Sequence, residues 1–275
     1  MIDAAVGGAN ERLQPIDELS TSLGQSLALF LHPLYAYCAM DFATGRKRAD
    51  MPKVNFDAEP APLSVDIDRA ALVIIDMQRD FLEPGGFGEA LGNDVSRLQA
   101  AVEPCRQVLD AARRVGMLVI HTREGHRPDL SDAPPHKVER GDPATRIGAP
   151  GPMGRILVRG EPGHDIIPEL YPLPAEPVID KPGKGAFYQT DIELMLRNRG
   201  IDTLFVCGVT TEVCVNTTVR EANDRGFRCI VLSDCCGSYF PEFHAAGLAM
   251  IKAQGGIFGS VTGSQPLLNS LASMS

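Results

Sequence analysis

The stretch TLFVCGVTTEVCVNTTVREANDRG, residues 203–226, contains the change of pattern that decides the fold. Its first part is a continuous apolar run, which is typical of a strand that is buried on both faces of a parallel sheet. Its last part has helical composition and ends at a glycine. One cysteine, Cys214, lies where the strand-like run gives way to the helix. The stretch therefore predicts a strand–turn–helix unit with a thiol at its turn.

The same alternation continues along the chain on both sides of this unit. Repeated strand–helix alternation predicts a parallel sheet with helices on both faces. We therefore expect a three-layer α/β/α fold around a mostly parallel sheet of roughly six strands. The expected strands are residues 70–76, 117–122, 176–181, 202–209, 228–234 and 257–261, and the expected helices are residues 94–116, 190–200, 213–226 and 241–256.

The organised pattern begins only after the first 60 of the 275 residues. We expect an N-terminal appendage of uncertain structure at 1–60, with Met51 as a candidate start of the protein, and one domain at 61–275. The apolar run at 26–40 is interrupted by His32 and Pro33 and is shorter than the roughly 20 residues that a membrane-spanning helix needs. No basic region precedes it, which argues against a secretory signal. The proline- and glycine-rich stretch at 123–163 has the length of a lid or binding loop.

Charge and cysteine usage exclude several classes of function. The formal net charge is -9, and the sequence has no basic block or aromatic–basic stripe. This pattern argues against nucleic acid or an anionic membrane as a partner. The seven cysteines are odd in number and form no CxxC motif, which is typical of a reducing compartment rather than of a disulfide framework. We therefore expect a cytoplasmic protein that acts on a small molecule.

Three reactive residue types follow predicted strands. Asp76 ends the first apolar run, Lys181 ends EPVIDK, and Cys214 follows TLFVCGV. The carboxyl ends of parallel strands share one edge of the sheet, which is where α/β proteins carry their sites. We expect the acid, the amine and the thiol to lie together at this edge.

These groups suit covalent catalysis. A thiol reacts as a thiolate, and a helix N-terminus is expected to lower the pKa of Cys214. Asp76 could take the thiol proton and later give it to a leaving amine, with Lys181 holding the carboxylate in place. Backbone N–H groups of the turn at 208–214 could stabilise a developing oxyanion.

Each residue also has a purely structural interpretation. A cysteine after an apolar strand is often buried, and an acid at a strand end often caps a helix. KPGKG lacks the GxxxxGK[ST] spacing of a phosphate loop. A thiol redox protein would need a second cysteine near Cys214, for which only Cys207 on the preceding strand is available. A non-catalytic binding module has no need of all three groups.

Other polar and thiol residues give weaker signals. His121, His126 and Asp129 could suggest a metal, but their spacing favours packing roles. Adjacent cysteines rarely bridge, so Cys235 and Cys236 are expected to be structural.

Three segments together resemble the signature of the isochorismatase-like cysteine hydrolases. These segments are ALVIIDMQRDF, DKPGKGAF and GVTTEVCVNTTVREANDRGF. The resemblance covers about residues 70–261. It implies a catalytic triad of Asp76, Lys181 and Cys214 in a hydrolase of linear amide C–N bonds.

The family resemblance implies further features of the site. It places a non-proline cis peptide between Val209 and Thr210, and it assigns the amides of Thr210 and Cys214 to an oxyanion hole. It implies that no metal or organic cofactor is needed, and that the protein is a homo-oligomer, either a dimer or a tetramer.

Within the family, the resemblance is closest to the biuret hydrolases. The segments that carry it are HTREGHRPDLSDAPP, GRILVRGEPGHDIIPELYP, KPGKGAFYQTD and REANDRG. It implies a small polar pocket lined by Phe81, Lys184 and Gln254, and hydrolysis of biuret to allophanate and ammonia through a Cys214 thioester. Ureidoacrylate, triuret and other N-carbamoyl compounds are the alternative substrates on the same triad. The long N-terminal segment departs from the family pattern.

Overall fold

A six-stranded sheet forms the centre of the protein, with its strands in the spatial order β10-β9-β8-β3-β4-β7. A computed structural model describes residues 53–274. Every neighbouring pair in this sheet is parallel, so the predicted α/β fold is confirmed. The strands are β3 (Ala70–Ile75), β4 (Leu118–Glu124), β7 (Val178–Lys181), β8 (Thr203–Val209), β9 (Arg228–Gly237) and β10 (Ser260–Thr262).

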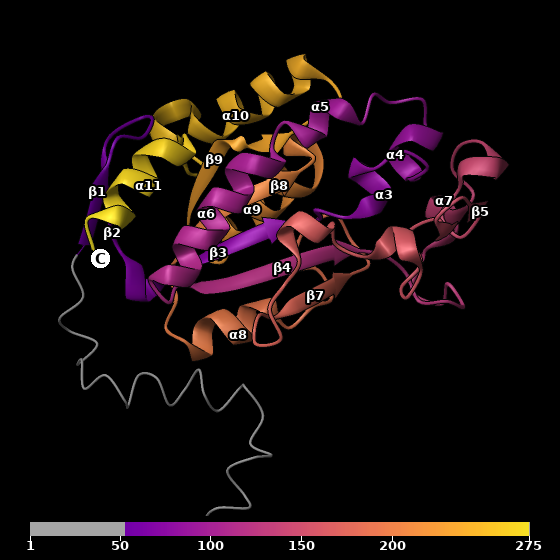
Figure 1. Ribbon diagram of the computed structural model, residues 1–275, viewed down its shortest axis with the longest axis horizontal. Coiled ribbons are helices and arrows are strands. Elements are labelled where there is room, and N and C mark those ends of the chain that lie inside the picture. Colours follow the sequence, from indigo (N-terminus) through magenta and orange to yellow (C-terminus); the bar gives the residue numbers. More distant parts are fainter. Residues whose placement is uncertain (1–52, 275) are drawn as a thin grey trace, which may run out of the picture. The chain divides into compact units, whose positions relative to one another are not determined.

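Helices cover both faces of the sheet, with α6 on the near side in Figure 1 and α9 on the far side. All six residues of β3 are buried, and alternate side chains point to opposite faces. Leu72 and Ile74 join the core under α6 and α11, whereas Val73 and Ile75 join the core under α8, α9 and α10. The longer helices are α6 (Val102–Arg114), α8 (Ile192–Asn198), α9 (Asn216–Asp224), α10 (Pro241–Gly256) and α11 (Ser264–Ala272).

A small hairpin extends the domain toward the N-terminus. Strand β1 (Lys53–Phe56) pairs antiparallel with β2 (Leu63–Asp66). Val54 and Phe56 are buried in the core, and the Phe56 ring lies 5.9 Å from that of Phe205. The predicted boundary at residue 60 is therefore too late, because residues 53–60 belong to the folded domain. Met51 and the rest of the predicted appendage lie outside the described residues.

Short elements occupy the connections near the carboxyl ends of the strands, at the right of Figure 1. The segment between β4 and β7, which includes the predicted loop except its first two residues, contains only short helices and two-residue strands. No helix within residues 53–274 is long and apolar enough to cross a membrane. These short elements are α3 (Arg79–Leu82), α4 (Phe87–Ala90), α5 (Ser96–Gln99), α7 (Pro135–Val138), η3 (Pro143–Thr145), β5 (Pro150–Gly151), β6 (Gly154–Arg155), η4 (Pro162–His164), η5 (Pro168–Leu170) and the π-helical turn η6 (Thr211–Val215). One further short helix, η2 (Ile67–Arg69), directly precedes β3.

The central strand makes a testable contribution to stability. Leu72 is fully buried in the core, so Leu72→Ala is expected to lower the free energy of unfolding by about 2–5 kcal/mol, through lost burial and the cavity left behind. Urea unfolding followed by circular dichroism measures this change. Leu194→Ala is the matched control, because Leu194 is 62% exposed and its loss should change stability by less than about 0.5 kcal/mol.

Candidate active site

A buried ion pair lies at the carboxyl edge of the sheet. The Lys181 Nζ atom lies 2.7 Å from Asp76 Oδ2, and both side chains are fully buried. The ammonium also donates hydrogen bonds to the carbonyls of Gly183, at 3.0 Å, and Lys184, at 2.8 Å. Thr122 Oγ1 donates to the other Asp76 oxygen at 2.6 Å. Both charged groups are therefore well paired in the absence of water.

Strand order explains why an acid and an amine so distant in sequence meet. Asp76 directly follows β3, and Lys181 ends β7, with β4 between them. Neighbouring strands are about 4.8 Å apart, so the two backbones are separated by about two such spacings. A lysine side chain is long enough to cross the end of β4. The Asp76 backbone is left-handed, with φ of 49°, which is uncommon for a residue other than glycine.

Gly208 allows the segment that carries the thiol to approach Asp76. Its φ is 112°, and a Cβ atom at this position would lie 2.0 Å from the carbonyl oxygen of Ile75. No side chain fits there, so only glycine lets the ends of β8 and β3 lie this close.

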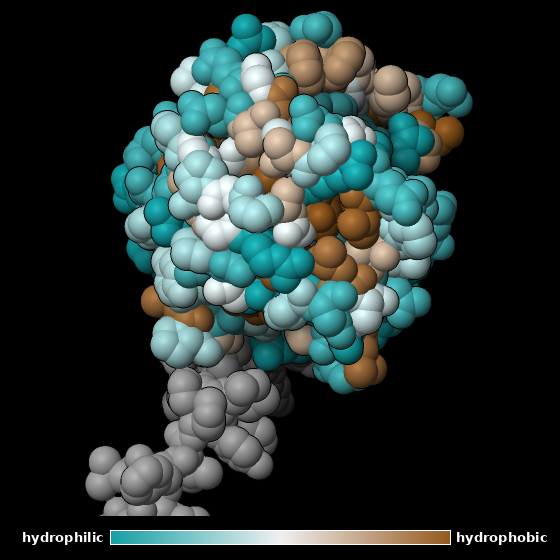
Figure 2. Space-filling model, turned by 90° about the vertical axis from the view of Figure 1, so that its right-hand side faces the viewer, coloured by the Kyte–Doolittle hydropathy of each residue, from teal (hydrophilic) through white to brown (hydrophobic). Residues whose placement is uncertain are grey.

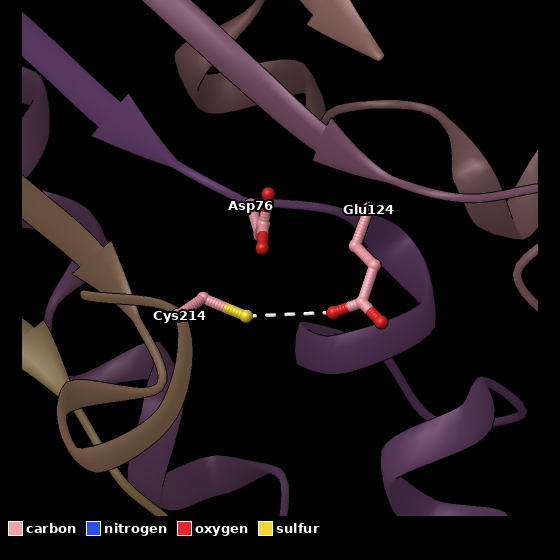
Figure 3. Close-up of side chains that lie close together, drawn as sticks. All are labelled: Asp76, Glu124 and Cys214. Carbon is pink, nitrogen blue, oxygen red and sulfur yellow. Dashed lines mark hydrogen bonds between the residues drawn. The ribbon is translucent and has the colours of Figure 1, made fainter. Parts of the chain in front are cut away.

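Cys214 lies in η6, between β8 and α9, and is 4% exposed. Its Sγ donates a hydrogen bond to Glu124 Oε2 at 3.4 Å. Figure 3 shows this contact, with the Asp76 carboxylate also near the Cys214 sulfur. One donor atom from each of Asp76, Glu124 and Cys214 lies within 4.8 Å of the others. The predicted acid, amine and thiol are therefore brought together.

The protonation state of the thiol differs from the prediction. Burial raises the pKa of Cys214 well above its usual value, and the charges of Asp76 and Glu124 raise it further, while Lys181 opposes them. The expected lowering by the helix N-terminus is therefore wrong, because removal from water outweighs it. The resting thiol is protonated at neutral pH, so a neighbouring base must remove its proton before it can react.

Glu124 is a site residue that the sequence analysis missed. It ends β4, is 1% exposed, and forms a 2.5 Å ion pair with Lys184. Burial alone would raise the pKa of Glu124, but Lys184 and Lys181 reverse this effect and hold it below its ordinary value. The buried Gln78 side chain fixes the Glu124 backbone, accepting from its N–H at 2.7 Å and donating to its carbonyl at 3.0 Å. An acid at the end of a predicted strand would have marked Glu124 as a candidate. The predicted strand ended at residue 122, two residues before Glu124, so this criterion did not select it.

The peptide bond between Val209 and Thr210 is cis, as the family resemblance implied. It directly precedes the turn that carries Cys214. The assignment of the Thr210 and Cys214 amides to an oxyanion hole stays a prediction.

Figure 2 faces the edge at which the strands end, where a group of hydrophobic side chains is bordered by hydrophilic ones. The reacting groups belong to the same edge of the sheet and are buried. Lys184, at 33% exposed, is the most open of the charged groups around the thiol.

Comparison with known proteins agrees with this geometry. The sequence model of one protein family, the isochorismatase domain, matches residues 70–263 of this chain. The chain belongs to the isochorismatase family. The predicted family and its hydrolase class are thus confirmed.

Several relatives within the isochorismatase family have known names or structures. The ureidoacrylate amidohydrolase RutB of Azorhizobium caulinodans is 32% identical over 190 residues, which cover 68% of this chain and 84% of that protein. A cysteine hydrolase from Pseudomonas syringae has a similar structure, with a TM-score of 0.66 and 28% identity over 82% of this chain and all of that one. An N-carbamoylsarcosine amidase from Thermoplasma acidophilum gives a TM-score of 0.55 and 25% identity over 71% of this chain and 96% of that one.

The predicted substrate-binding residues of this isochorismatase-family chain separate into different places. Lys184 lies at the site through its ion pair with Glu124. Phe81, in α3, is partly buried and packs edge-on against Phe87 at 6.2 Å, and its contact with substrate stays a prediction. Gln254 is exposed near the end of α10. Because α10 runs back from the end of β9 to the start of β10, Gln254 lies at the opposite edge of the sheet from the triad of the same chain, and its contact with substrate stays a prediction.

The histidines considered as metal ligands have other partners. His121 contacts Glu176 at 3.2 Å, and His126 contacts Asp132 at 3.3 Å. Asp129 accepts a hydrogen bond from the backbone N–H of Ser131. Within residues 53–274, the clustered candidate metal donors are those of Asp76, Glu124 and Cys214. Two ammonium groups already pair the two carboxylates, which disfavours a cation at this position.

The position of Gln254 yields a prediction that opposes the one from sequence. Gln254→Leu is expected to keep kcat/KM within about threefold of the wild type, because a change at the opposite sheet edge touches no reacting group. Steady-state kinetics on the best amide substrate measures this. A loss of 10-fold or more would mean that the end of α10 reaches the site.

Proposed function

We propose that this protein is a cysteine amidohydrolase that cleaves a small N-carbamoyl compound bearing a carboxylate, of which ureidoacrylate is the type. The observation that carries the proposal is the buried Cys214 thiol beside the Asp76–Lys181 pair and a second carboxylate. An acid, a base and a nucleophile within contact distance are what amide cleavage by covalent catalysis requires.

The proposed reaction has two stages. In the first, a carboxylate takes the Cys214 proton, the thiolate attacks the ureido carbonyl, and the same proton leaves on the departing nitrogen. In the second, water attacks the thioester and the thiol is restored. Amides of Thr210 and Cys214 would stabilise the oxyanion in both stages. The residues of the site supply the nucleophile and carry the protons in these steps.

The choice of substrate class rests partly on the relatives. The sequence resemblance favours biuret, whereas the named relatives are a ureidoacrylate amidohydrolase and an N-carbamoylsarcosine amidase. These names support the alternative substrate class over biuret. The shared chemical feature is an amide that carries a carbamoyl group.

The charges around the thiol also support a carboxylate on the substrate. Asp76 and Glu124 are each paired with one lysine, Lys181 and Lys184. A third ammonium, that of Lys137 in α7, donates to the carbonyl of the residue after Lys181 at 2.7 Å. Within the described chain, no carboxylate lies within ion-pair distance of Lys137.

Lys137 is thus an unmatched cation close to the site. Burial lowers the pKa of Lys137, and the charges of Lys184 and Lys181 lower it further, while Glu124 opposes them. Three ammonium groups face two carboxylates, and a monoanionic substrate would balance the charge. A neutral diamide such as biuret would leave Lys137 without a counter-charge.

A panel assay tests the proposed activity. Ureidoacrylate, an N-carbamoyl amino acid, biuret and triuret are incubated with the enzyme, and ammonia release is measured after the products decompose. We expect the two substrates that carry a carboxylate, ureidoacrylate and the N-carbamoyl amino acid, to have the highest kcat/KM. Cys214→Ala should be inactive with all of them, since it lacks the nucleophile. Faster hydrolysis of biuret would overturn the substrate class, and no hydrolysis of any amide would overturn the enzyme activity.

Lys137→Gln tests the role of the unmatched cation. KM for the carboxylate substrates is expected to rise at least 10-fold, about 1.4 kcal/mol of lost binding, with little change in kcat. KM for any neutral carbamoyl compound that is hydrolysed should change less than threefold. Arg140→Gln, at an exposed position nearby, is the control for general loss of positive charge. Equal effects on charged and neutral substrates would contradict the role.

The proposal includes a cytoplasmic location and a homo-oligomer. Six cysteines in the described chain are all free and buried, which supports a reducing compartment. The dimer or tetramer rests on the family resemblance alone, and gel filtration with light scattering measures it.

A further inference from the structure

The outer face of α10, which lies along the upper side of the domain in Figure 1, is apolar. A helix that borders water normally presents polar side chains to it. The exposed positions of α6, on the other face of the sheet, follow this rule and are Glu103, Arg106, Gln107 and Arg114. The exposed positions of α10 between Glu242 and Ile251 are instead all apolar, and they are Phe243, Ala245, Ala246, Ala249 and Met250. Phe243 is 48% and Met250 52% exposed, which is typical of a surface that binds another protein.

A hollow of about 290 Å³ runs beside this face and has an acidic end and a basic end. At one end Glu212, from η6, lies beside Gly247 of α10. At the other end Arg220, from α9, lies against Met250, with a guanidinium nitrogen 3.8 Å from the sulfur. Glu212 Oε2 is buried and has no hydrogen-bond partner among residues 53–274. Arg220 donates to the neutral side chain of Asn216 at 2.7 Å, and no carboxylate of the described chain lies within ion-pair distance of it.

We infer that a second copy of this chain packs on this face, across a twofold axis near Gly247, and that Glu212 of each copy pairs with Arg220 of the other. The inference rests on the proposed homo-oligomer and locates its interface. A twofold axis reverses the direction of α10, so the acidic end of one hollow meets the basic end of the other. Phe243 and Met250 lie on either side of Gly247 along the helix, so the same reversal places Phe243 of one copy against Met250 of the other.

The face is complementary to itself, as a contact between identical copies requires. It carries both members of each pair: a carboxylate and a guanidinium, and an aromatic ring and a thioether, which attract one another. The small residues Ala246 and Gly247 between the two large side chains allow two helices to approach closely. A basic partner would satisfy Glu212 alone and an acidic partner Arg220 alone, whereas a second copy satisfies both.

The contact reaches the turn that carries the nucleophile. Glu212 precedes Cys214 by two residues in η6. The neighbouring Thr211 hydroxyl donates to the carbonyl of Gly237 at 3.1 Å, so it accepts the hydrogen bond from His244 Nδ1 of α10, at 2.8 Å. A second copy on the outer face of α10 therefore packs against the elements that position the thiol.

Two charge-reversed variants of the full chain test the pairing, with mass measured by light scattering after gel filtration. Glu212→Arg sets two cations against each other across the interface, and Arg220→Glu sets two anions against each other. Each variant alone is expected to have half the mass of the wild-type assembly. Mixed in equal amounts, the two variants should recover the wild-type mass, because every arginine then meets a glutamate of the other chain.

Phe243→Glu tests the apolar part of the interface. It is expected to halve the mass as well, because it places a carboxylate in the centre of the contact. Leu194→Glu is the matched control, since Leu194 is an exposed leucine on α8, and it should keep the wild-type mass. Thermal unfolding of each variant separates dissociation from misfolding.

Several results would overturn the inference. A wild-type mass that persists in Phe243→Glu would place the interface elsewhere, and variants that dissociate but do not recover on mixing would exclude the pairing of Glu212 with Arg220. A monomeric wild type would overturn the homo-oligomer together with its interface. If residues 1–52 of such a monomer became more sensitive to trypsin in Phe243→Glu, the face would belong to that segment. None of these measurements needs a substrate, so they decide the interface even if no amide is hydrolysed.

Discussion

The site depends on one buried ion pair, Asp76 with Lys181. Two charges without water are stable only when every donor and acceptor is satisfied. Here Thr122 and two backbone carbonyls complete the set. The pair joins the ends of β3 and β7 across β4, so it fixes the relative positions of three strands at the functional edge. It also places a positive charge beside Cys214, which would stabilise the thiolate once its proton has gone.

Much of this arrangement could be predicted from the sequence. Continuous apolar runs identified the strands, and parallel topology then required Asp76, Lys181 and Cys214 to share one edge. The same rule applied to Gln254 would have placed it at the other edge, because a crossover helix returns the chain to the start of the next strand. The prediction for Gln254 followed a resemblance and took no account of this topology.

The remaining features depend on tertiary contacts. The pKa of Cys214 reflects how completely water is excluded, and local sequence carries no measure of that. Glu124 required the correct end of β4, which lies two residues past the predicted one. Lys137 lies in a segment with only short regular elements, so its approach to the turn after Lys181 could not be read from a periodic pattern. The β1–β2 hairpin was missed because its strands are only four residues long.

The burial of the reacting groups has a consequence for the kinetics. Cys214 is 4% exposed and Asp76 not at all, so the described structure gives the reacting groups almost no open contact with solvent. Each catalytic cycle must therefore include a displacement that admits the substrate and a second one that releases the product. Such motions are slowed by friction with the solvent, whereas proton transfer and bond cleavage within the closed site are not. A turnover rate that falls as sucrose makes the solution more viscous would identify opening, rather than chemistry, as the slow step.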